Sequence, residues 1–375
     1  MRRARGRDAG AASALGAIAL LIALTACAPG DRPASSPVAV PPTAPVATVA
    51  TPTTIIESLS APWSVVAAGA SFLISERDTG RILEFGADRS VREVATIGDV
   101  VHGGEGGLLG LAVTPAGDAL FAYSTAADGN RVQRYPLLGT AGAWALGGAT
   151  TIIDGLPAAG THNGGRIAFG PDGRLYVPVG DAGDADAAQD PDHMNGKILR
   201  LEPDGTIPPD NPSPHSPVYS LGHRNVQGIA WSADGRMFAS EFGQNTWDEL
   251  NEIVPGGNYG WPEVEGFGGA DAGFVDPLLT WAPAEASPSG IAVVGDRIVI
   301  ANLRGQVLRV VPLDAVTAGE PIDPSRVDEL YGGEFGRLRD VVAAADGTAW
   351  VLTNNTDGRG DARDGDDRLI SVPLP

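Results

Sequence analysis

The sequence predicts an all-β protein, and more specifically a six-bladed β-propeller. Gly and Pro are abundant, with 51 and 30 residues, and no long amphipathic helical pattern is present. A unit of strand, tight turn, strand, loop and strand recurs six times, starting at residues 65, 111, 167, 229, 291 and 341. Irregular repeats of this length suit propeller blades that carry insertions on one face, whereas a β-sandwich would not repeat one unit six times. The six units are 63–85, 111–135, 167–201, 229–254, 291–311 and 341–372.

Residues 1–27 have the features of an export signal rather than of a folded element. Four arginines precede a short apolar stretch, Ala11–Ala23, which is too short to favour a membrane-spanning helix. Leu24-Thr25-Ala26-Cys27 then resembles a bacterial lipobox. We therefore expect an exported lipoprotein, attached through Cys27 to the extracytoplasmic face of the cell membrane. The alternative is an ordinary secretory signal with an incidental cysteine, and Arg2-Arg3 leaves twin-arginine export open.

Residues 28–53 are expected to be a tether without regular structure. They are rich in Pro, Ala, Ser, Thr and Val and nearly uncharged, with neither a helical nor a strand period. Such a segment buries too little apolar surface to offset the entropy of ordering it. Residues 54–375 remain for the propeller, which has no cysteine and therefore no disulfide.

Within the propeller, 54–59 is expected to supply the strand that closes the ring against the last blade. The third unit contains the clearest hairpin, in which 167–180 alternates apolar and polar residues around Pro171-Asp172-Gly173. Functional loops of propellers surround the central channel near the ends of the inner strands. The polar residues at those places are His102, Glu105, His162, His223, Arg224, Asn225, Arg304, Arg337 and Arg339.

The charge of the chain argues against one class of ligand and for another. A formal net charge of −20 and a pI of about 4.5 argue against nucleic acid as a partner. Within this acidic protein, Arg224, Arg304, Arg337 and Arg339 predict a cationic pocket for a multiply anionic ligand. The alternative is that each arginine pairs with a neighbouring carboxylate. His162, in a glycine-rich loop at a strand mouth, is the candidate general base, against the alternative of a structural histidine.

Two acidic segments are candidate cation sites. In 241–259, the turn at Gly243-Gln244 offers backbone carbonyls, and Asp248, Glu249 and Tyr259 offer further oxygens of the kind that calcium prefers. The run 181–192 is also acidic, but it does not fit an EF-hand, and a solvated loop is the favoured interpretation.

Several motifs in this order resemble the glucose/sorbosone dehydrogenase family, the soluble quinoprotein sugar dehydrogenases. The similarity runs from about Leu59 to the C-terminus. The matching motifs are Ala61-Pro62-Trp63-Ser64, 76–82, Gly106-Gly107-Leu108-Leu109-Gly110, His162-Asn163-Gly164-Gly165, Pro171-Asp172-Gly173, Gly180-Asp181, Gly222-His223-Arg224-Asn225, Asp248-Glu249-Leu250-Asn251, 256–262, Ser289-Gly290-Ile291-Ala292 and Arg337-Leu338-Arg339-Asp340.

The resemblance implies a propeller that binds pyrroloquinoline quinone (PQQ) and calcium and oxidises aldose sugars, passing electrons to an external acceptor. It assigns the catalytic base to His162, which takes the proton of the anomeric hydroxyl while hydride passes to the quinone. The Gly243 carbonyl would ligate the calcium that polarises the quinone. The remaining implied residues are Arg224, Asn225, Arg337 and Arg339 in the quinone pocket, and Glu249 and Tyr259 in a second, structural calcium site.

Three positions depart from the family pattern. Glu105 stands where Gln is usual, Gly243-Gln244 where a Gly-Pro pair supplies two carbonyls, and Arg304 where a pocket lysine is usual. Glu105 adds negative charge near an anionic cofactor and should weaken its binding, whereas Gln244 should be harmless because carbonyls ligate the ion. Arg304 keeps the charge of a lysine but not its shape.

These observations lead to one preferred function and two alternatives. The preferred one is a membrane-tethered, PQQ- and calcium-dependent aldose dehydrogenase, with no membrane contact beyond the lipid. The alternatives are a calcium-dependent hydrolase of the lactonase type and a sugar- or protein-binding propeller without catalysis. The fold alone does not separate them.

Overall fold

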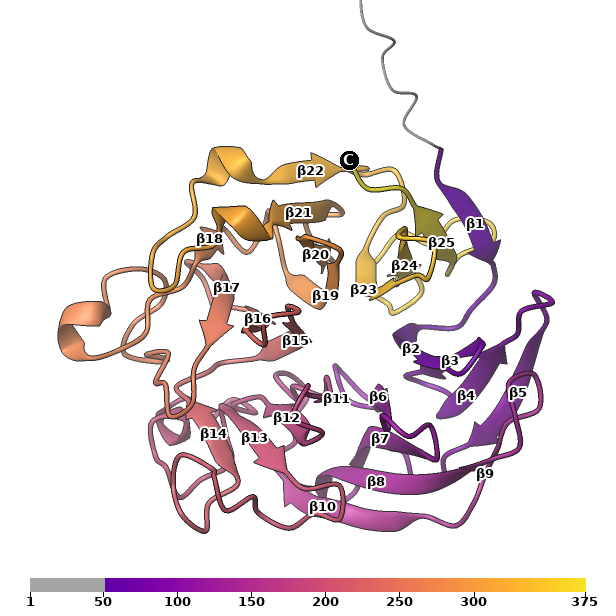
Figure 1. Cartoon of the computed structure of the whole chain (residues 1–375), viewed down its shortest axis with the longest axis horizontal. Helices are drawn as coiled ribbons and strands as arrows, with labels where there is room; N and C mark the ends of the chain where they lie inside the picture. Colours follow the sequence, from indigo (N-terminus) through magenta and orange to yellow (C-terminus); the bar gives the residue numbers. More distant parts are fainter. Residues whose placement is uncertain (1–50) are drawn as a thin grey trace, which may run out of the picture. The chain divides into compact units, whose positions relative to one another are not determined.

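The computed structural model describes residues 51–375, which all lie within one compact unit. Six sheets lie around a common centre (Figure 1), which confirms the predicted all-β, six-bladed propeller. The described residues contain no α-helix, only the 3-10 turns η1 (Asp186–Ala188), η2 (Ala270–Ala272), η3 (Leu313–Ala315) and η4 (Pro324–Arg326). None of these helices is long and apolar enough to cross a membrane.

Each blade is an antiparallel sheet of at least four strands, and the strands occupy equivalent places from the centre outward. The inner strands are β2 (Pro62–Ala68), β6 (Leu108–Val113), β11 (Ala168–Phe169), β15 (Val226–Trp231), β19 (Pro288–Val294) and β23 (Leu338–Ala343). The second strands are β3 (Ser71–Glu76), β7 (Ala119–Ala126), β12 (Leu175–Val179), β16 (Met237–Glu241), β20 (Arg297–Asn302) and β24 (Ala349–Thr353). The third strands are β4 (Arg81–Phe85), β8 (Gly129–Leu138), β13 (Lys197–Leu201), β17 (Asp248–Ile253), β21 (Leu308–Pro312) and β25 (Leu369–Val372).

A fourth, outer strand completes every blade, and the sequence did not predict five of these six strands. The outer strands are β5 (Val91–Thr96), β10 (Thr150–Leu156), β14 (Val218–Leu221), β18 (Leu279–Trp281), β22 (Asp328–Leu330) and β1 (Thr53–Ile56), and β9 (Ala145–Leu146) adds a further pairing to β8. Most outer strands lie at the solvent edge, where they need no apolar run. The residues of β5, for example, are exposed or half-buried throughout.

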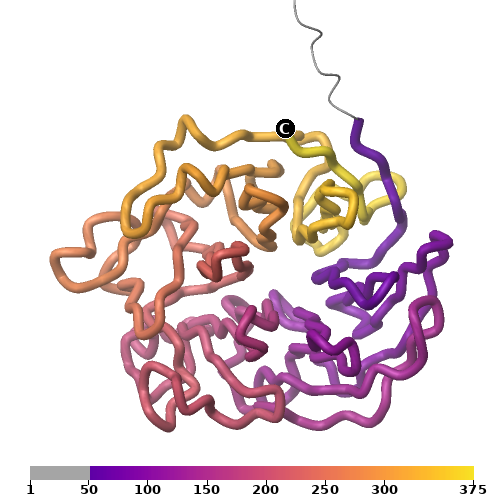
Figure 2. Tube along the Cα trace, viewed as in Figure 1, coloured from indigo at the N-terminus to yellow at the C-terminus, as the bar shows by residue number. Residues whose placement is uncertain are grey.

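The ring is closed by the two ends of the described chain, as the sequence predicted. β1 pairs with β25 in antiparallel fashion, with Thr53 opposite Ser371. Figure 2 shows these first and last segments side by side. Thr53, the last residue of the predicted tether, is therefore already part of a blade. The rest of that tether through residue 50, and the predicted export signal at 1–27, lie outside the described residues.

The apolar core lies between neighbouring blades. The largest buried cluster joins the second and third blades and includes Phe121, Tyr123, Val177 and Leu199. Every residue of β7 is buried, which explains why this strand has no polar alternation. Full burial of one such side chain stabilises the fold by about 1.5–3 kcal/mol.

A polar contact network ties four blades together at the centre. The buried Arg166 donates from Nη1 to Asp340 at 2.7 Å and to Ser64 at 3.2 Å, and from Nε to the Gln227 carbonyl at 3.1 Å. Its guanidinium also lies 4.2 Å from the Trp63 ring centroid. Because a buried cation is costly unless fully bonded, this network helps to fix the inner strands relative to one another.

Candidate functional site

Loops at the ends of the inner strands enclose a cavity of about 440 Å³. This volume falls within the range of roughly 300–1,000 Å³ that is usual for small-molecule sites. Nine of the residues selected from the sequence line it: Glu105, His162, Arg224, Gly243, Gln244, Asp248, Arg304, Arg337 and Arg339. Convergence of these residues from separate blades is what the propeller prediction required.

His162 is held in the cavity wall in an unusual backbone conformation. Its φ is +57°, in the left-handed region that costs non-glycine residues energy, so surrounding contacts must hold it. Glu105 Oε2 accepts a hydrogen bond from the His162 N–H at 2.8 Å, and the His162 carbonyl accepts one from Ala182 at 3.1 Å. A Cβ on Gly180 would lie 1.9 Å from that carbonyl oxygen, which explains the glycine there.

The contacts of the His162 ring define its tautomer. Nδ1 lies 2.7 Å from Asp181 Oδ1, and Nε2 lies 2.7 Å from Arg224 Nη2. A guanidinium can only donate, so Nε2 is the accepting nitrogen and Nδ1 carries the proton that it donates to Asp181. Nε2 of His162 therefore carries the lone pair that can take up a proton.

Asp181 is a functional residue that sequence reasoning placed in a solvated loop, and that interpretation was wrong. Its side chain is buried and also accepts hydrogen bonds from the Gly183 N–H at 2.8 Å and from Trp261 Nε1 at 2.9 Å. Burial raises the pKa of Asp181, but the hydrogen bonds from His162 and Gly183 outweigh it and leave the pKa below its usual value. The charged carboxylate thus orients His162. The signal available in the sequence was the Gly180-Asp181 motif at the end of a buried strand.

Arg224 bridges His162 and the predicted metal-binding turn. Its Nη1 donates to the carbonyls of Phe242 at 3.1 Å and Gly243 at 2.6 Å, and its guanidinium lies 5.5 Å from the Trp261 ring. No carboxylate lies within ion-pair distance of Arg224 in the described part of the chain, and its Nε is buried without a partner there. Burial lowers the pKa of Arg224, opposed by Asp181 and other nearby acids.

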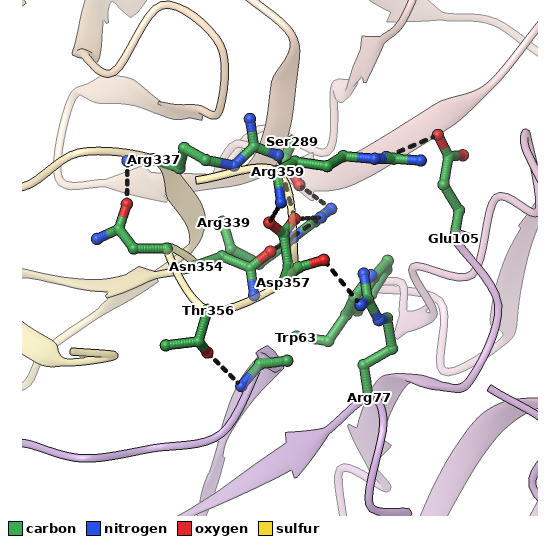
Figure 3. A network of polar contacts seen from close by, with 12 residues as sticks. Trp63, Arg77, Glu105, Ser289, Arg337, Arg339, Asn354, Thr356, Asp357 and Arg359 are labelled. Carbon is green, nitrogen blue, oxygen red and sulfur yellow. Dashed lines mark hydrogen bonds and ion pairs between the residues drawn. The ribbon is translucent and has the colours of Figure 1, made fainter. Parts of the chain in front are cut away.

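On another wall, Arg337 and Arg339 share one buried carboxylate, Asp357, which the sequence did not single out. Asp357 Oδ2 lies 3.2 Å from Arg337 Nη2 and 3.9 Å from Arg339 Nη2. Arg77 donates to the Asp357 carbonyl at 3.3 Å, so three guanidinium groups gather around this residue (Figure 3). Burial raises the pKa of Asp357, but the two arginine charges lower it below the usual value.

Arg359 is a fifth arginine of the cavity that sequence reasoning missed, because its Asp-Gly-Arg-Gly segment was treated as a variable loop. Arg359 Nη1 lies 3.1 Å from Glu105 Oε1, across the cavity (Figure 3). Glu105 therefore contacts both an arginine and the backbone of His162. Arg304 also lines the cavity, and its exposed side chain has no ion pair in the region from 51 onward.

The residues expected to bind metal lie in two places. The Gly243 carbonyl faces the cavity but accepts the Arg224 hydrogen bond, and the Gln244 N–H is bonded to Glu265. Glu249 and Tyr259 do not reach this cavity. They line a separate void of about 10 Å³ together with Glu241 and Glu265.

The Glu249 void is acidic, but its side chains are largely engaged. Burial and then Glu241 raise the pKa of Glu249, whose two oxygens accept from Gly266 N and Asn251 Nδ2. The Tyr259 hydroxyl donates to the Glu252 carbonyl at 2.7 Å, so Tyr259 could offer an ion only its own carbonyl. Within 51–375, no three His, Cys, Asp or Glu side chains are grouped as metal ligands.

The other residues selected from the sequence do not line the cavity. Asn225 is buried, accepts from the Gly164 N–H at 3.0 Å, and supports the His162 loop from behind. His102 is exposed. His223 is fully buried between Ser220 Oγ at 2.8 Å and Glu241 at 2.9 Å. Ser220, His223 and Glu241 are hydrogen-bonded in the same sequence as the Ser-His-Glu catalytic triad of hydrolases. Ser220 is itself fully buried, however, so a substrate cannot reach its hydroxyl.

Comparison with known proteins extends these observations. The sequence model of the glucose/sorbosone dehydrogenase family matches residues 59–362. The solved PQQ-bound aldose sugar dehydrogenase of Streptomyces coelicolor is 46% identical, with a TM-score of 0.79 over 86% of this chain and 96% of that one. A putative oxidoreductase (glucose dehydrogenase) of Thermus thermophilus is 41% identical, with a TM-score of 0.77 over 86% and 99% of the two chains.

A third relative matches over a shorter stretch. The quinoprotein glucose dehydrogenase B of Acinetobacter calcoaceticus is 34% identical over 232 residues, which are 52% of this chain and 48% of that protein. The chain therefore spans about half the length of this curated relative.

Proposed function

The chain belongs to the glucose/sorbosone dehydrogenase family, and from this premise we propose that it oxidises the anomeric carbon of aldose sugars with PQQ as the bound cofactor. The observation that carries the proposal is a single cavity in which a hydrogen-bonded His162–Asp181 pair lies beside five arginines. The Streptomyces relative, described as PQQ-bound, supports the choice of cofactor.

The five arginines that line the cavity suit a multiply anionic cofactor. PQQ carries three carboxylates, and guanidinium groups pair with carboxylates through two parallel hydrogen bonds. Within 51–375, the buried Nε atoms of Arg224 and Arg337 lack hydrogen-bond partners. Arg224 also has no carboxylate within ion-pair distance there, so an anion in this cavity would give it a direct ion-pair partner. Arg224, Arg337, Arg339 and Arg304 are the residues that would hold it.

His162 then acts as the general base. Oxidation of an aldose to its lactone removes two electrons with one hydrogen from C1 and a proton from the anomeric hydroxyl. Nε2 of His162 takes the hydroxyl proton, and the charged Asp181 stabilises the imidazolium that forms. PQQ held by Arg224, Arg304, Arg337 and Arg339 would supply the two-electron acceptor for the hydrogen at C1, and calcium would supply Lewis-acid polarisation of it.

Arg224 must release His162 before the base can act, because its Nη2 donates to the same Nε2 lone pair. An anionic ligand offers Arg224 a stronger acceptor than a neutral imidazole or a backbone carbonyl. Binding of the cofactor would therefore free both His162 Nε2 and the Gly243 carbonyl. This coupling makes the base available only in the loaded site.

We further propose calcium at the two predicted positions. The first would use the Gly243 and Gln244 carbonyls, with its remaining oxygens from water and the cofactor. The second would use Glu249 and the Tyr259 carbonyl. The raised pKa of Glu249 supports it, since a cation in the void would stabilise the charged carboxylate.

The electrons leave to an external acceptor, and we propose that the enzyme works outside the cytoplasm as a Cys27-linked lipoprotein. The lipobox-like 24–27 and the Pro-rich 28–53 support this location. Cys27→Ser should release a folded domain from the membrane, as judged by fractionation. A variant that stays membrane-bound, or a wild-type protein without lipid in its mass spectrum, would show that Cys27 is incidental.

Titration of the cofactor-free protein with PQQ tests the central proposal. Calorimetry with calcium present should show saturable binding at roughly 50 μM PQQ, which fills any site of low-micromolar Kd. Dye-linked oxidation of glucose or another aldose should then appear only in the titrated sample. A flat titration would favour the binding propeller, and lactone hydrolysis without PQQ would favour the hydrolase.

A further inference from the structure

The sequence contains one lysine, Lys197, and the structure buries it completely. Its Nζ donates to three backbone carbonyls, of Ala187 and Ala188 at 2.9 Å each and of Asn195 at 2.7 Å. An ammonium group has three donors, so every one of its hydrogens is used. No carboxylate lies within ion-pair distance of Lys197 in the described residues. This lysine is thus an internal cation bound by carbonyl oxygens alone.

The carbonyls belong to a loop in which two of them also accept backbone hydrogen bonds, the Ala187 carbonyl from Asp190 N at 3.2 Å and the Ala188 carbonyl from Gly222 N at 3.0 Å. Residues 180–196 connect β12 to β13, and the 3-10 turn η1 ends there at Ala188. Carbonyls at the end of a short helical turn have no partner within it. Lys197, the first residue of β13, adds a charged donor to two of them and ties them to Asn195. Burial lowers the pKa of Lys197 to about 8, whereas carbonyl acceptors favour its charged form.

The same loop positions the candidate base. Asn195, whose carbonyl Lys197 binds, donates from Nδ2 to the Asp181 carbonyl at 2.8 Å. Asp181 in turn bonds the His162 ring at 2.7 Å. Two bonded steps therefore separate the lysine from the residue that orients the base.

The loop also holds the segment that carries Arg224. The Ala188 carbonyl, which Lys197 binds, also accepts from Gly222 N at 3.0 Å, and Asp181 N donates to the Arg224 carbonyl at 2.8 Å. Both residues that contact the His162 ring therefore depend on the backbone that Lys197 holds.

We propose that Lys197 is a positioning residue, an internal ammonium ion that holds the 181–196 loop so that Asp181 and Arg224 meet His162. Its catalytic consequence rests on the proposed dehydrogenase function, whereas its effect on the loop does not. A lysine serves here because its compact charge offers three donors, whereas a planar guanidinium could not direct the same bonds at three converging carbonyls.

Lys197→Ala with added amines tests the proposal. The variant removes the ammonium and leaves a void that n-propylammonium can fill, while tetramethylammonium has the charge without N–H donors and propanol has the shape without the charge. We expect turnover to fall by about 10- to 100-fold, as for a base displaced by an ångström, with a smaller change in KM. Propylammonium alone should restore turnover.

Arg200→Ala is the matched control. Arg200 lies on the same strand, is also buried, and pairs with Asp172 at 2.9 Å and Asp210 at 3.0 Å, away from the loop. The Arg200→Ala variant should be less stable than wild type but should keep the same turnover per folded molecule. Added amines should change neither its stability nor its turnover. Equal loss of turnover in both variants, tracking the folded fraction and unaffected by propylammonium, would overturn the proposal.

Two measurements on cofactor-free protein separate this proposal from the proposed function. Amide hydrogen exchange across 181–196 should speed up in Lys197→Ala and slow again with propylammonium, whether or not the protein oxidises sugars. In wild-type protein labelled with ¹⁵N-lysine, the single side chain should give one ammonium signal that exchanges slowly with water at neutral pH. A missing ammonium signal, or unchanged loop exchange in the variant, would overturn the role of Lys197 even in an active enzyme.

Discussion

The cavity has two walls that carry similar charge in different ways. On the first, the paired wall, Arg337 and Arg339 share Asp357, and Arg359 pairs with Glu105. On the second, the carbonyl wall, Arg224 is bonded to His162 and to the carbonyls of Phe242 and Gly243. Both present guanidinium groups to the same space, but only on the first do these arginines form direct ion pairs with carboxylates of the described chain.

The difference predicts that changes to the paired wall affect mainly the stability of the protein, whereas changes to the carbonyl wall affect mainly ligand binding. A buried charge pair contributes little net stability, yet removal of one partner is costly because the other is left buried and uncompensated. Burial away from water lowers the pKa of Arg339 to about 9, despite the opposing charge of Asp357. On the carbonyl wall Arg224 has, among the described residues, no ion-pair partner to lose, although Asp181 and other acids lie nearby, and it can form its first direct ion pair with an anionic ligand.

The largest expected effect is on the carbonyl wall, at His162. His162→Gln should lower turnover by about 100- to 10,000-fold, the usual contribution of a positioned general base. Melting temperature and PQQ binding should change little, because the Glu105 contact is to the backbone of His162 and the Gln amide can still donate to Asp181 or accept from Arg224. Turnover near wild type in a stable, loaded variant would remove His162 as the base. Asp181→Asn, which keeps the shape but not the charge, is the control for orientation.

Asp357→Asn tests the paired wall. With Arg337 and Arg339 left uncompensated, the free energy of unfolding should drop by about 3 kcal/mol in cofactor-free protein. PQQ should recover part of that loss, because its carboxylates replace the missing charge. Urea unfolding with and without PQQ measures both effects.

Arg224→Gln is the matched change on the carbonyl wall. It should lower stability less than Asp357→Asn does, because it removes hydrogen bonds to neutral acceptors and leaves no buried charge uncompensated. It should weaken PQQ binding by about 10- to 100-fold, the value of a charge-assisted hydrogen bond. If both variants lost stability equally, the contrast between the walls would be wrong.

A smaller effect concerns the acidic void behind the carbonyl wall. Burial and Glu241 raise the pKa of Glu249 above its usual 4.5, so the folded protein keeps a proton that the unfolded chain releases. Stability from this group is therefore full below pH 4.5 and declines as pH rises toward the folded pKa, by up to about 1.4 kcal/mol per pH unit.

Urea unfolding between mildly acidic and neutral pH measures the slope. Glu249→Gln should flatten it, and calcium should flatten it in wild type by binding the charged carboxylate. The same slope in the variant would show that another group titrates there.

The smallest effect is expected at Glu105. Loss of one negative charge near an anionic ligand would by itself favour binding by roughly 0.5–2 kcal/mol. Here, however, Glu105 neutralises Arg359 and bonds His162 N, so Glu105→Gln also loosens both. We therefore expect a gain at the lower end of that range, or none, in PQQ calorimetry. A tenfold gain would show that the Arg359 pair does not persist in solution.

The propeller was predictable because its signal repeats. Each inner strand carries an apolar run followed by a Gly-containing turn, so six independent patterns agreed on one fold, and five of the six predicted starts lie inside β2, β6, β15, β19 and β23. The outer strands were not predicted because strands such as β5 face solvent and need no alternation of apolar and polar residues.

The candidate site was predictable only in part. His162, Arg224, Arg337 and Arg339 sit beside inner strands, where position alone marks them. Asp181, Asp357 and Arg359 lie in long polar loops, where charged residues are usually solvated, and only folding of the loop buries or aims them. Lys197 is the sole lysine of the sequence, but nothing in the sequence indicates that the carbonyls of Ala187, Ala188 and Asn195 converge on it.

The pairing of β1 with β25 constrains the order in which the protein can form. The first strand of the ring must wait, unpaired, until the last strand has been synthesised, because no other segment completes that blade. Closure also joins residues almost as far apart as the described chain allows, and such contacts form slowly. A polypeptide that emerges N-terminus first therefore keeps β1 unpaired throughout its synthesis. A chain that ends before Leu369 lacks β25 and therefore also leaves β1 without a partner.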